Sequence, residues 1–189
     1  MTFAAGPEKA LVCPNKTILE QFFGYYFKYL SGLGQAVNFE ADAMEAVSRA
    51  AASGHIAPFL TYVENALQTE AGLHSRLQLS EASIQFFMLG AARLLTGFKA
   101  TAEEEALGVG VTDVMIRPMA ESDFRQSYLV ELKYLTQEAG TPTAVEQKLN
   151  DACRQLAAYA SAENLRTLPN LKKVAVVFVG STVKGVRYL

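Results

Sequence analysis

The segment Tyr128-Leu129-Val130-Glu131-Leu132-Lys133-Tyr134 decides how the rest of the chain is interpreted. Its aliphatic, aromatic and β-branched residues predict a β-strand. Side chains alternate between the two faces of a strand, so Leu129, Glu131 and Lys133 point to one face. Burying an acid and a base within such an apolar run costs free energy. Glu131 and Lys133 therefore make this face of the strand a candidate functional site.

A second apolar strand precedes this segment and carries a single acid: Val111-Thr112-Asp113-Val114-Met115-Ile116. On this strand Asp113 shares a face with Met115, because alternate residues point the same way. Glu131 follows Asp113 by 18 positions, a spacing that suits a hairpin with a loop. If the two strands pair, Asp113, Glu131 and Lys133 converge at one point.

Composition narrows the class of protein. The chain has 189 residues, 50% of them hydrophobic and 19% charged, which suits one globular domain or one domain with a helical extension. A net charge of −2 gives no signal of a dedicated nucleic-acid binder, which usually has a strong basic excess, and it leaves local basic patches open. Two distant cysteines and two histidines exclude a disulfide framework and argue against a zinc or histidine metal site. Neither a signal peptide nor a membrane-spanning run is recognisable, so a soluble, cytoplasmic protein without a membrane partner is expected.

Hydrophobic periodicity and capping residues predict the order of the elements. Helices are expected near residues 17–30, 40–52, 56–69 and 80–95, and Ser80 is the expected N-cap of the last. Strands near 99–105, 111–116 and 128–134 would form an antiparallel meander. Thr141-Pro142 begins a long helix, and strands near 173–180 and 185–189 follow. We therefore predict an α/β core over residues 76–189 with the order α-β-β-β-α-β-β, preceded by a helical extension over residues 1–75.

The converging residues suit metal chemistry. Carboxylates are the ligands that hard cations such as Mg²⁺ prefer, and the backbone carbonyl of Leu132 would add an oxygen. A bound metal polarises a phosphoryl oxygen, and Lys133 would stabilise the charge of the transition state. The chemistry indicated is metal-assisted hydrolysis of a phosphodiester. The alternative is that Glu131 and Lys133 form a solvated surface ion pair, worth about 0–1 kcal/mol, and that Asp113 is an ordinary strand-end residue.

The order of these motifs resembles the PD-(D/E)XK nuclease superfamily. The resemblance spans roughly residues 80–189 and consists of Gly108-Val109-Gly110-Val111-Thr112-Asp113, then Glu131-Leu132-Lys133, then a helix that carries Gln155. It implies a restriction-endonuclease-like mixed sheet, Mg²⁺ or Mn²⁺ as cofactor and nucleic acid as partner. It also implies Asp113 and Glu131 as metal ligands and Lys133 as the catalytic lysine.

The resemblance suggests two further site residues. Gln155 occupies the place of a helix glutamine that many members carry near the site, although an ordinary polar residue fits that place equally well. Glu81 is the candidate for an acid that the superfamily often adds from the helix before the sheet. The alternative for Glu81 is an acid in the first turn of a helix, where it is favourable with the helix dipole.

Within the superfamily, the chain resembles a nuclease-like domain found C-terminal to an AAA-ATPase-like domain in many bacterial proteins. Cys13-Pro14-Asn15-Lys16 resembles the segment that precedes the helical lead-in of that branch. The chain would then be the C-terminal part of such an architecture, with an AAA-ATPase-like domain as partner. It contains no glycine-rich phosphate loop, which agrees with this interpretation. Val111 departs from the branch, whose members often carry arginine there, and this points to weaker phosphate contact or a changed activity.

Three functions remain open on the sequence. The first is a metal-dependent nuclease. The second is a catalytically inactive nuclease-like fold that acts in binding or regulation, favoured by the net charge of −2 and by Val111. The third is a helical interaction module in residues 15–70 that docks a partner domain or a second copy of the chain. Its motive is an aromatic helix face made of Phe22, Phe23, Tyr25, Tyr26 and Phe27.

Overall fold

The computed structural model describes residues 39–69, 79–93, 98–103, 112–121, 125–159, 165, 168 and 170–189. The predicted helix near residues 17–30, with its aromatic face, lies outside these residues. So do the glycine segment at 108–110 and Val111.

The order of the described elements confirms the predicted core. The core runs in the order helix, three strands, helix and two strands, and two further described helices precede it. The bounds differ from the predicted ones by only a few residues. The elements are α2 (Phe39–Ser53), α3 (Ala57–Thr69), α5 (Glu81–Arg93), β1 (Phe98–Glu103), β2 (Thr112–Pro118), β3 (Ser127–Leu135), α6 (Pro142–Tyr159), β4 (Leu171–Val179) and β5 (Thr182–Tyr188).

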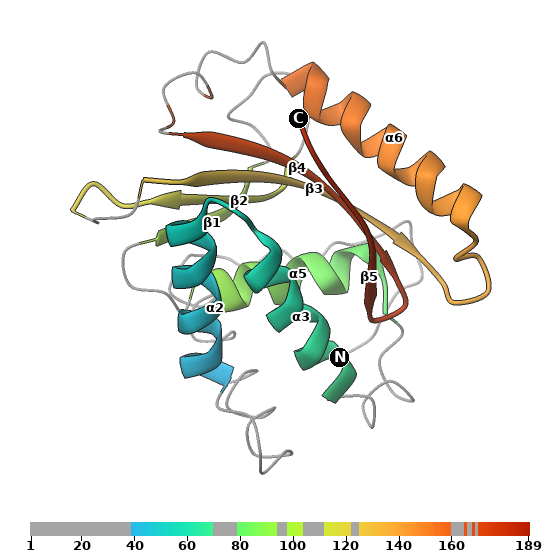
Figure 1. Ribbon diagram of the computed structural model, residues 1–189, viewed down its shortest axis with the longest axis horizontal. Coiled ribbons are helices and arrows are strands. Elements are labelled where there is room, and N and C mark those ends of the chain that lie inside the picture. Colours follow the sequence, from blue (N-terminus) through green and yellow to red (C-terminus); the bar gives the residue numbers. More distant parts are fainter. Residues whose placement is uncertain are drawn as a thin grey trace, which may run out of the picture.

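The five strands form one mixed sheet in the order β1-β2-β3-β4-β5 (Figure 1). β1, β2 and β3 make the antiparallel meander that the sequence predicts. β4 then pairs parallel to β3, and β5 returns antiparallel along β4. Parallel neighbours need a crossover connection, and α6 supplies it between β3 and β4. β3 therefore lies at the centre of the sheet, with an antiparallel neighbour on one edge and a parallel neighbour on the other.

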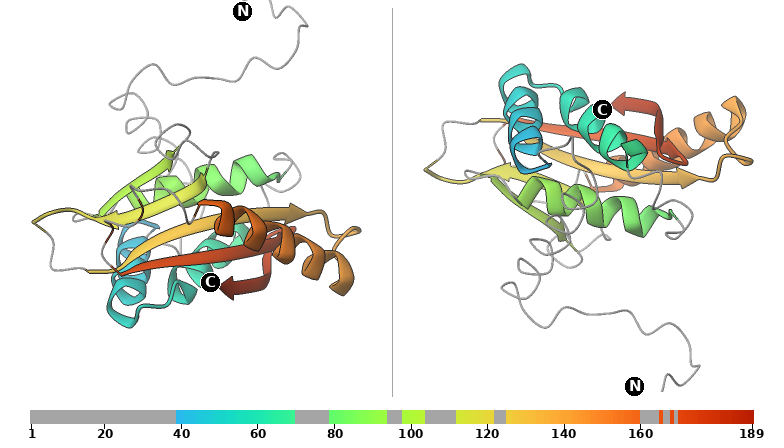
Figure 2. Two further views of the ribbon diagram at one scale, coloured as in Figure 1. Left: turned by 90° about the horizontal axis from the view of Figure 1, so that it is seen from above. Right: turned by 90° about the horizontal axis from the view of Figure 1, so that it is seen from below.

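Helices cover both faces of the sheet (Figures 1 and 2). α6 covers one face, where it buries an apolar stripe against β2, β3 and β4. α2, α3 and α5 cover the opposite face and share one apolar cluster with the sheet. None of the described helices combines the length and the apolar character needed to cross a membrane. In this stripe Leu149, Ala152, Leu156 and Tyr159 are buried, and Val145 is partly buried.

Capping residues fix where the two helices beside the sheet begin. The Ser83 backbone N–H donates to Ser80 Oγ at 3.2 Å, and the Ser80 N–H donates to Ser83 Oγ at 2.8 Å. At α6, the Ala144 N–H donates to Thr141 Oγ1 at 3.2 Å. Side chains that accept from free amides in this way stabilise helix N-termini. The cap at Ser80 places the next residue, Glu81, in the first turn of α5.

The far ends of β3 and β4 are held together by close packing. A Cβ atom at Gly140 would lie 2.2 Å from Val179 Cγ1, so only glycine fits there. Gly180 has a φ of 57°, in the left-handed region that favours glycine, and its N–H donates to the Leu135 carbonyl at 2.9 Å. The central strand is therefore fixed at the end that lies beyond Glu131 and Lys133.

Candidate active site

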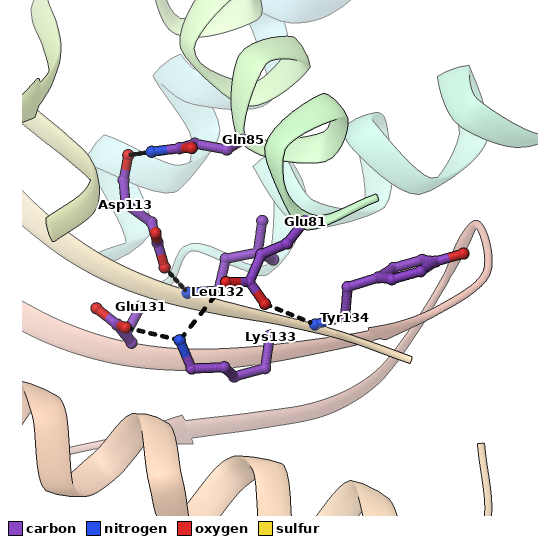
Figure 3. A network of polar contacts seen from close by, with 7 residues as sticks. All are labelled: Glu81, Gln85, Asp113, Glu131, Leu132, Lys133 and Tyr134. Carbon is purple, nitrogen blue, oxygen red and sulfur yellow. Dashed lines mark hydrogen bonds and ion pairs between the residues drawn. The ribbon is translucent and has the colours of Figure 1, made fainter. Parts of the chain in front are cut away.

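The pairing between β2 and β3 ends abruptly at one point. Its cross-strand pairs run from Ile116↔Tyr128 to Val114↔Val130. Beyond the last pair, the Leu132 N–H donates to Oδ2 of Asp113 at 2.7 Å (Figure 3). A buried backbone amide needs an acceptor, and here the carboxylate of Asp113 supplies it. The Asp113 side chain is therefore fixed against the central strand.

Asp113 and Glu131 lie on the same side of the sheet. Met115 and Leu129 are cross-strand partners, and both belong to the apolar cluster beneath α6. Asp113 and Glu131 each lie two residues beyond this pair on their own strand, and residues two apart share a face. The strand pairing thus brings the two acids together, as the sequence predicts.

Lys133 lies between two carboxylates (Figure 3). Its Nζ donates to Oε1 of Glu131 at 2.8 Å and lies 3.7 Å from Oε1 of Glu81. The side chains of Lys133 and Glu131 are only 13% and 3% exposed, whereas that of Glu81 is 43% exposed. The alternative of a solvated surface pair is therefore wrong for Glu131 and Lys133.

Helix α5 contacts both strands where they separate. Oε2 of Glu81 accepts from the Tyr134 N–H at 3.2 Å, and Nε2 of Gln85 donates to the Asp113 carbonyl at 2.7 Å. Residues four apart are neighbours on one side of a helix, so Glu81 and Gln85 act from the same side. Beyond the last pair with β2, the amides of Leu132 and Tyr134 in β3 lie outside the backbone pairing with that strand. Side-chain carboxylates accept from both of them instead.

Burial dominates the electrostatics of the acids. It raises the pKa of Glu131 to about 7, against the lowering effect of the hydrogen bond from Lys133, and the charge of Asp113 raises it further. Burial also raises the pKa of Asp113, although the hydrogen bond from Leu132 opposes the shift. Burial lowers the pKa of Lys133, but its hydrogen bond to Glu131 and the charges of Glu131, Glu81 and Asp113 together raise the pKa above the ordinary value. The site therefore favours an additional positive charge.

The donor set fits a hard divalent cation. Oε2 of Glu131 is buried and has no hydrogen-bond partner among the described residues. In this part of the chain, no three histidine, cysteine, aspartate or glutamate side chains form a ready-made metal cluster. Mg²⁺ commonly binds through one or two carboxylates and keeps several waters. Asp113 and Glu131 would thus hold such a metal, and water or substrate would complete its coordination.

These contacts do not test two of the predicted site groups, the Gln155 side chain and the Leu132 carbonyl. Gln155 is exposed on α6, and no described hydrogen bond connects it with Asp113, Glu131 or Lys133. The N–H of Leu132 has a clear role, but the predicted role of its carbonyl as a ligand concerns a different atom. The roles of Gln155 and of the Leu132 carbonyl stay predictions.

Two contributions to this site were not anticipated from the sequence. The sequence places Gln85 one turn after Glu81 on the same side of the helix, but the hydrogen bond of Gln85 to the Asp113 carbonyl depends on where the strands separate, and no sequence motif signals that point. The second contribution comes from Tyr159, which lies in the apolar stripe of α6. Burial raises the pKa of its phenol, and the charges of Glu131 and Asp113 raise it further, so the phenol lies within their electrostatic reach. Tyr159 is the one residue of that stripe with a polar group, and this hydroxyl is the feature of the sequence that could have pointed to the site.

A family comparison agrees with this geometry. The profile of the PD-(D/E)XK nuclease superfamily matches residues 79–187, which is more than half of the chain. The chain belongs to the PD-(D/E)XK nuclease superfamily. The superfamily region begins one residue before the cap of α5 and ends one residue before the end of β5, so it contains α5, α6 and the sheet except for Tyr188. α2 and α3 lie outside it, and the division of the chain at residue 75 stays a prediction. No curated protein matches the chain significantly.

Proposed function

We propose that the protein is a nuclease that hydrolyses phosphodiester bonds of nucleic acids with Mg²⁺ or Mn²⁺. The observation that carries this proposal is the meeting of Asp113, Glu131 and Lys133 where β2 and β3 separate. One oxygen of the buried Glu131 has no hydrogen-bond partner within the described segments, which supports a cation there. Membership of the PD-(D/E)XK nuclease superfamily supports the reaction class.

The metal would be held by the carboxylates of Asp113 and Glu131, with the Leu132 carbonyl as a further oxygen ligand. When bound, a divalent cation supplies Lewis acidity toward the phosphate and lowers the pKa of a bound water. Hydrolysis forms one bond from the water oxygen to phosphorus and breaks one phosphorus–ester bond. Lys133 would place its ammonium beside the phosphoryl oxygens, where negative charge grows in the transition state.

Glu81 and Gln155 would support this set from the two helices. Glu81 contacts both Lys133 and the Tyr134 amide, which favours a role in orienting the lysine over a direct metal contact. Its position beside the same space still makes it a candidate ligand. Gln155 is exposed, so its amide is available to the substrate rather than to the buried acids.

The test is cleavage of double-stranded and single-stranded DNA and of RNA with Mg²⁺ or Mn²⁺. Asp113→Ala, Glu131→Ala and Lys133→Ala should each reduce the rate about a thousandfold or more, since each removes a metal ligand or the ammonium. Asp151→Ala is the matched control, because Asp151 is an acid on the outer side of α6 that pairs with Arg154. It should cleave at the wild-type rate.

The opposite result has a clear meaning. A wild-type protein that cleaves none of these substrates faster than Asp113→Ala would contradict the proposal. The catalytically inactive fold with a binding or regulatory role would then be the better account. A thermal melt of each variant shows whether a lost rate reflects lost chemistry or lost folding.

A further inference from the structure

The backbone at Asp113 lies where β2 pairs irregularly with both neighbours. On the β3 side, the last pair is Val114↔Val130. On the β1 side, the register shifts between Thr101↔Met115 and Glu103↔Thr112. Asp113 falls inside the shift, so regular pairing on either side does not fix its main chain. Such irregularities in strands are often found beside functional sites.

Two hydrogen bonds hold Asp113 in place of regular pairing. Its carboxylate accepts from the Leu132 N–H at 2.7 Å, and its carbonyl accepts from Nε2 of Gln85 at 2.7 Å. The first bond ties the side chain to β3. The second ties the main chain to α5, whose start is fixed by the cap at Ser80. Loss of the second bond would free the peptide that follows Asp113 and shift its carboxylate.

We propose that Gln85 is a positioning residue that sets the separation between the carboxylates of Asp113 and Glu131. This inference rests on the proposed function, because the separation matters only if the two acids share one cation. Gln85 acts through the Asp113 carbonyl and not on the metal or the substrate. Groups that orient metal ligands in this way typically change metal affinity by 10- to 100-fold when they are removed.

Substitutions at Gln85 separate shape from hydrogen bonding. Methionine has a similar length but no donor, so Gln85→Met removes the bond with little change in volume. Gln85→Lys keeps a donor at the end of a side chain of similar reach. The matched control is Gln68→Met, because the Gln68 amide on α3 donates to Glu64 and Thr182 and not to the site.

Amide exchange tests the structural part in the metal-free protein. The Leu132 N–H reports directly on the Asp113 carboxylate, whereas the Tyr134 N–H is held by Glu81. We expect Gln85→Met to speed exchange of the Leu132 amide about tenfold or more, and exchange at Tyr134 to change less. Gln68→Met should leave both unchanged. Equal exchange at Leu132 in the wild type and Gln85→Met would overturn the inference.

Mn²⁺ titration and steady-state kinetics test the functional part. Gln85→Met should weaken Mn²⁺ binding about tenfold or more and lower kcat more than it raises KM, and Gln85→Lys should restore part of both. Unchanged Mn²⁺ affinity in Gln85→Met would overturn the inference while leaving the proposed function intact. A wild-type protein with no Mn²⁺ affinity would overturn the proposed function and this inference together.

Discussion

The two edges of β3 differ sharply although they belong to one strand. Along β4, the pairing is unbroken from Ser127↔Leu171 to Leu135↔Val179. Along β2, the pairing ends at Val114↔Val130, and carboxylates then take over as acceptors for the strand's amides. The β4 edge is a regular ladder. At the β2 edge the backbone pairing stops, and side-chain carboxylates accept from the amides of β3 instead.

This difference shows how one strand provides both a rigid frame and a reactive site. A buried charge is costly unless it is paired and hydrogen-bonded, and the β2 edge leaves one oxygen of Glu131 without a partner in the described part of the chain. The β4 edge compensates through continuous pairing and through the apolar run at residues 174–179, which is buried throughout. The site is therefore built on a rigid strand, and its polar groups lie where the pairing of that strand with β2 ends.

The largest stability effect is expected on the regular edge. Phe178→Ala removes a fully buried ring from β4, so it should lower the free energy of unfolding by about 3–5 kcal/mol. Urea denaturation with and without Mn²⁺ measures it. The loss should be the same under both conditions, because Phe178 belongs to the apolar cluster and not to the site. A loss below about 1 kcal/mol would contradict the role given to this edge.

A smaller effect is expected when the buried ion pair is broken. Lys133→Met leaves the Glu131 carboxylate without its only described hydrogen-bond donor, so the metal-free protein should lose about 2–4 kcal/mol at pH 8. Adding Glu131→Gln should recover part of this loss, since the unpaired charge is then absent. Chemical denaturation of the two single variants and the double variant measures the coupling. Purely additive losses would show that the pair is not coupled.

Glu131 should also make the stability of the metal-free protein depend on pH. Its pKa is about 7 in the folded state and near 4.5 when unperturbed, so the folded state binds the proton more tightly. Stability should therefore fall as pH rises from about 4.5 to 7, by about 1–3 kcal/mol, and Glu131→Gln should lack this fall. Urea denaturation in EDTA across this range measures the difference. Parallel pH profiles of the two proteins would contradict the burial of an ionisable group there.

The smallest effect is expected at the helix cap on the regular side. Thr141→Ala removes the acceptor for the Ala144 N–H, so it should cost about 1 kcal/mol of stability. The rate of cleavage should stay at the wild-type value where both proteins are folded, because the cap lies outside the site. A thermal melt and the cleavage assay measure the two quantities. A large loss of rate with little loss of stability would mean that the start of α6 belongs to the site.

The sequence predicted the frame because local patterns determine it. Alternation in residues 128–134 marks β3 and the face shared by Glu131 and Lys133, and Ser80 and Thr141 mark the starts of α5 and α6. The two acids meet because antiparallel pairing follows from strand order and loop length. These features depend on residues close in sequence, or on the pairing of consecutive strands.

The contacts of α5 depend on information that local patterns do not contain. The contacts of Gln85 with the Asp113 carbonyl and of Glu81 with the Tyr134 amide exist because the β2–β3 ladder ends where it does. That endpoint arises from the register of three strands together. Gln155 was placed near the site by resemblance alone, and the exposure of its side chain depends on how α6 packs on the sheet.

The central claim is that Asp113 and Glu131, at the end of the β2–β3 ladder, share one divalent cation. Anomalous diffraction from crystals soaked in Mn²⁺ tests it most directly. We expect a peak at coordinating distance, about 2 Å, from one oxygen of each carboxylate, and no such peak in crystals of Glu131→Gln. The absence of a peak between the two acids in the wild-type protein, or a peak that only one of them contacts, would contradict the claim.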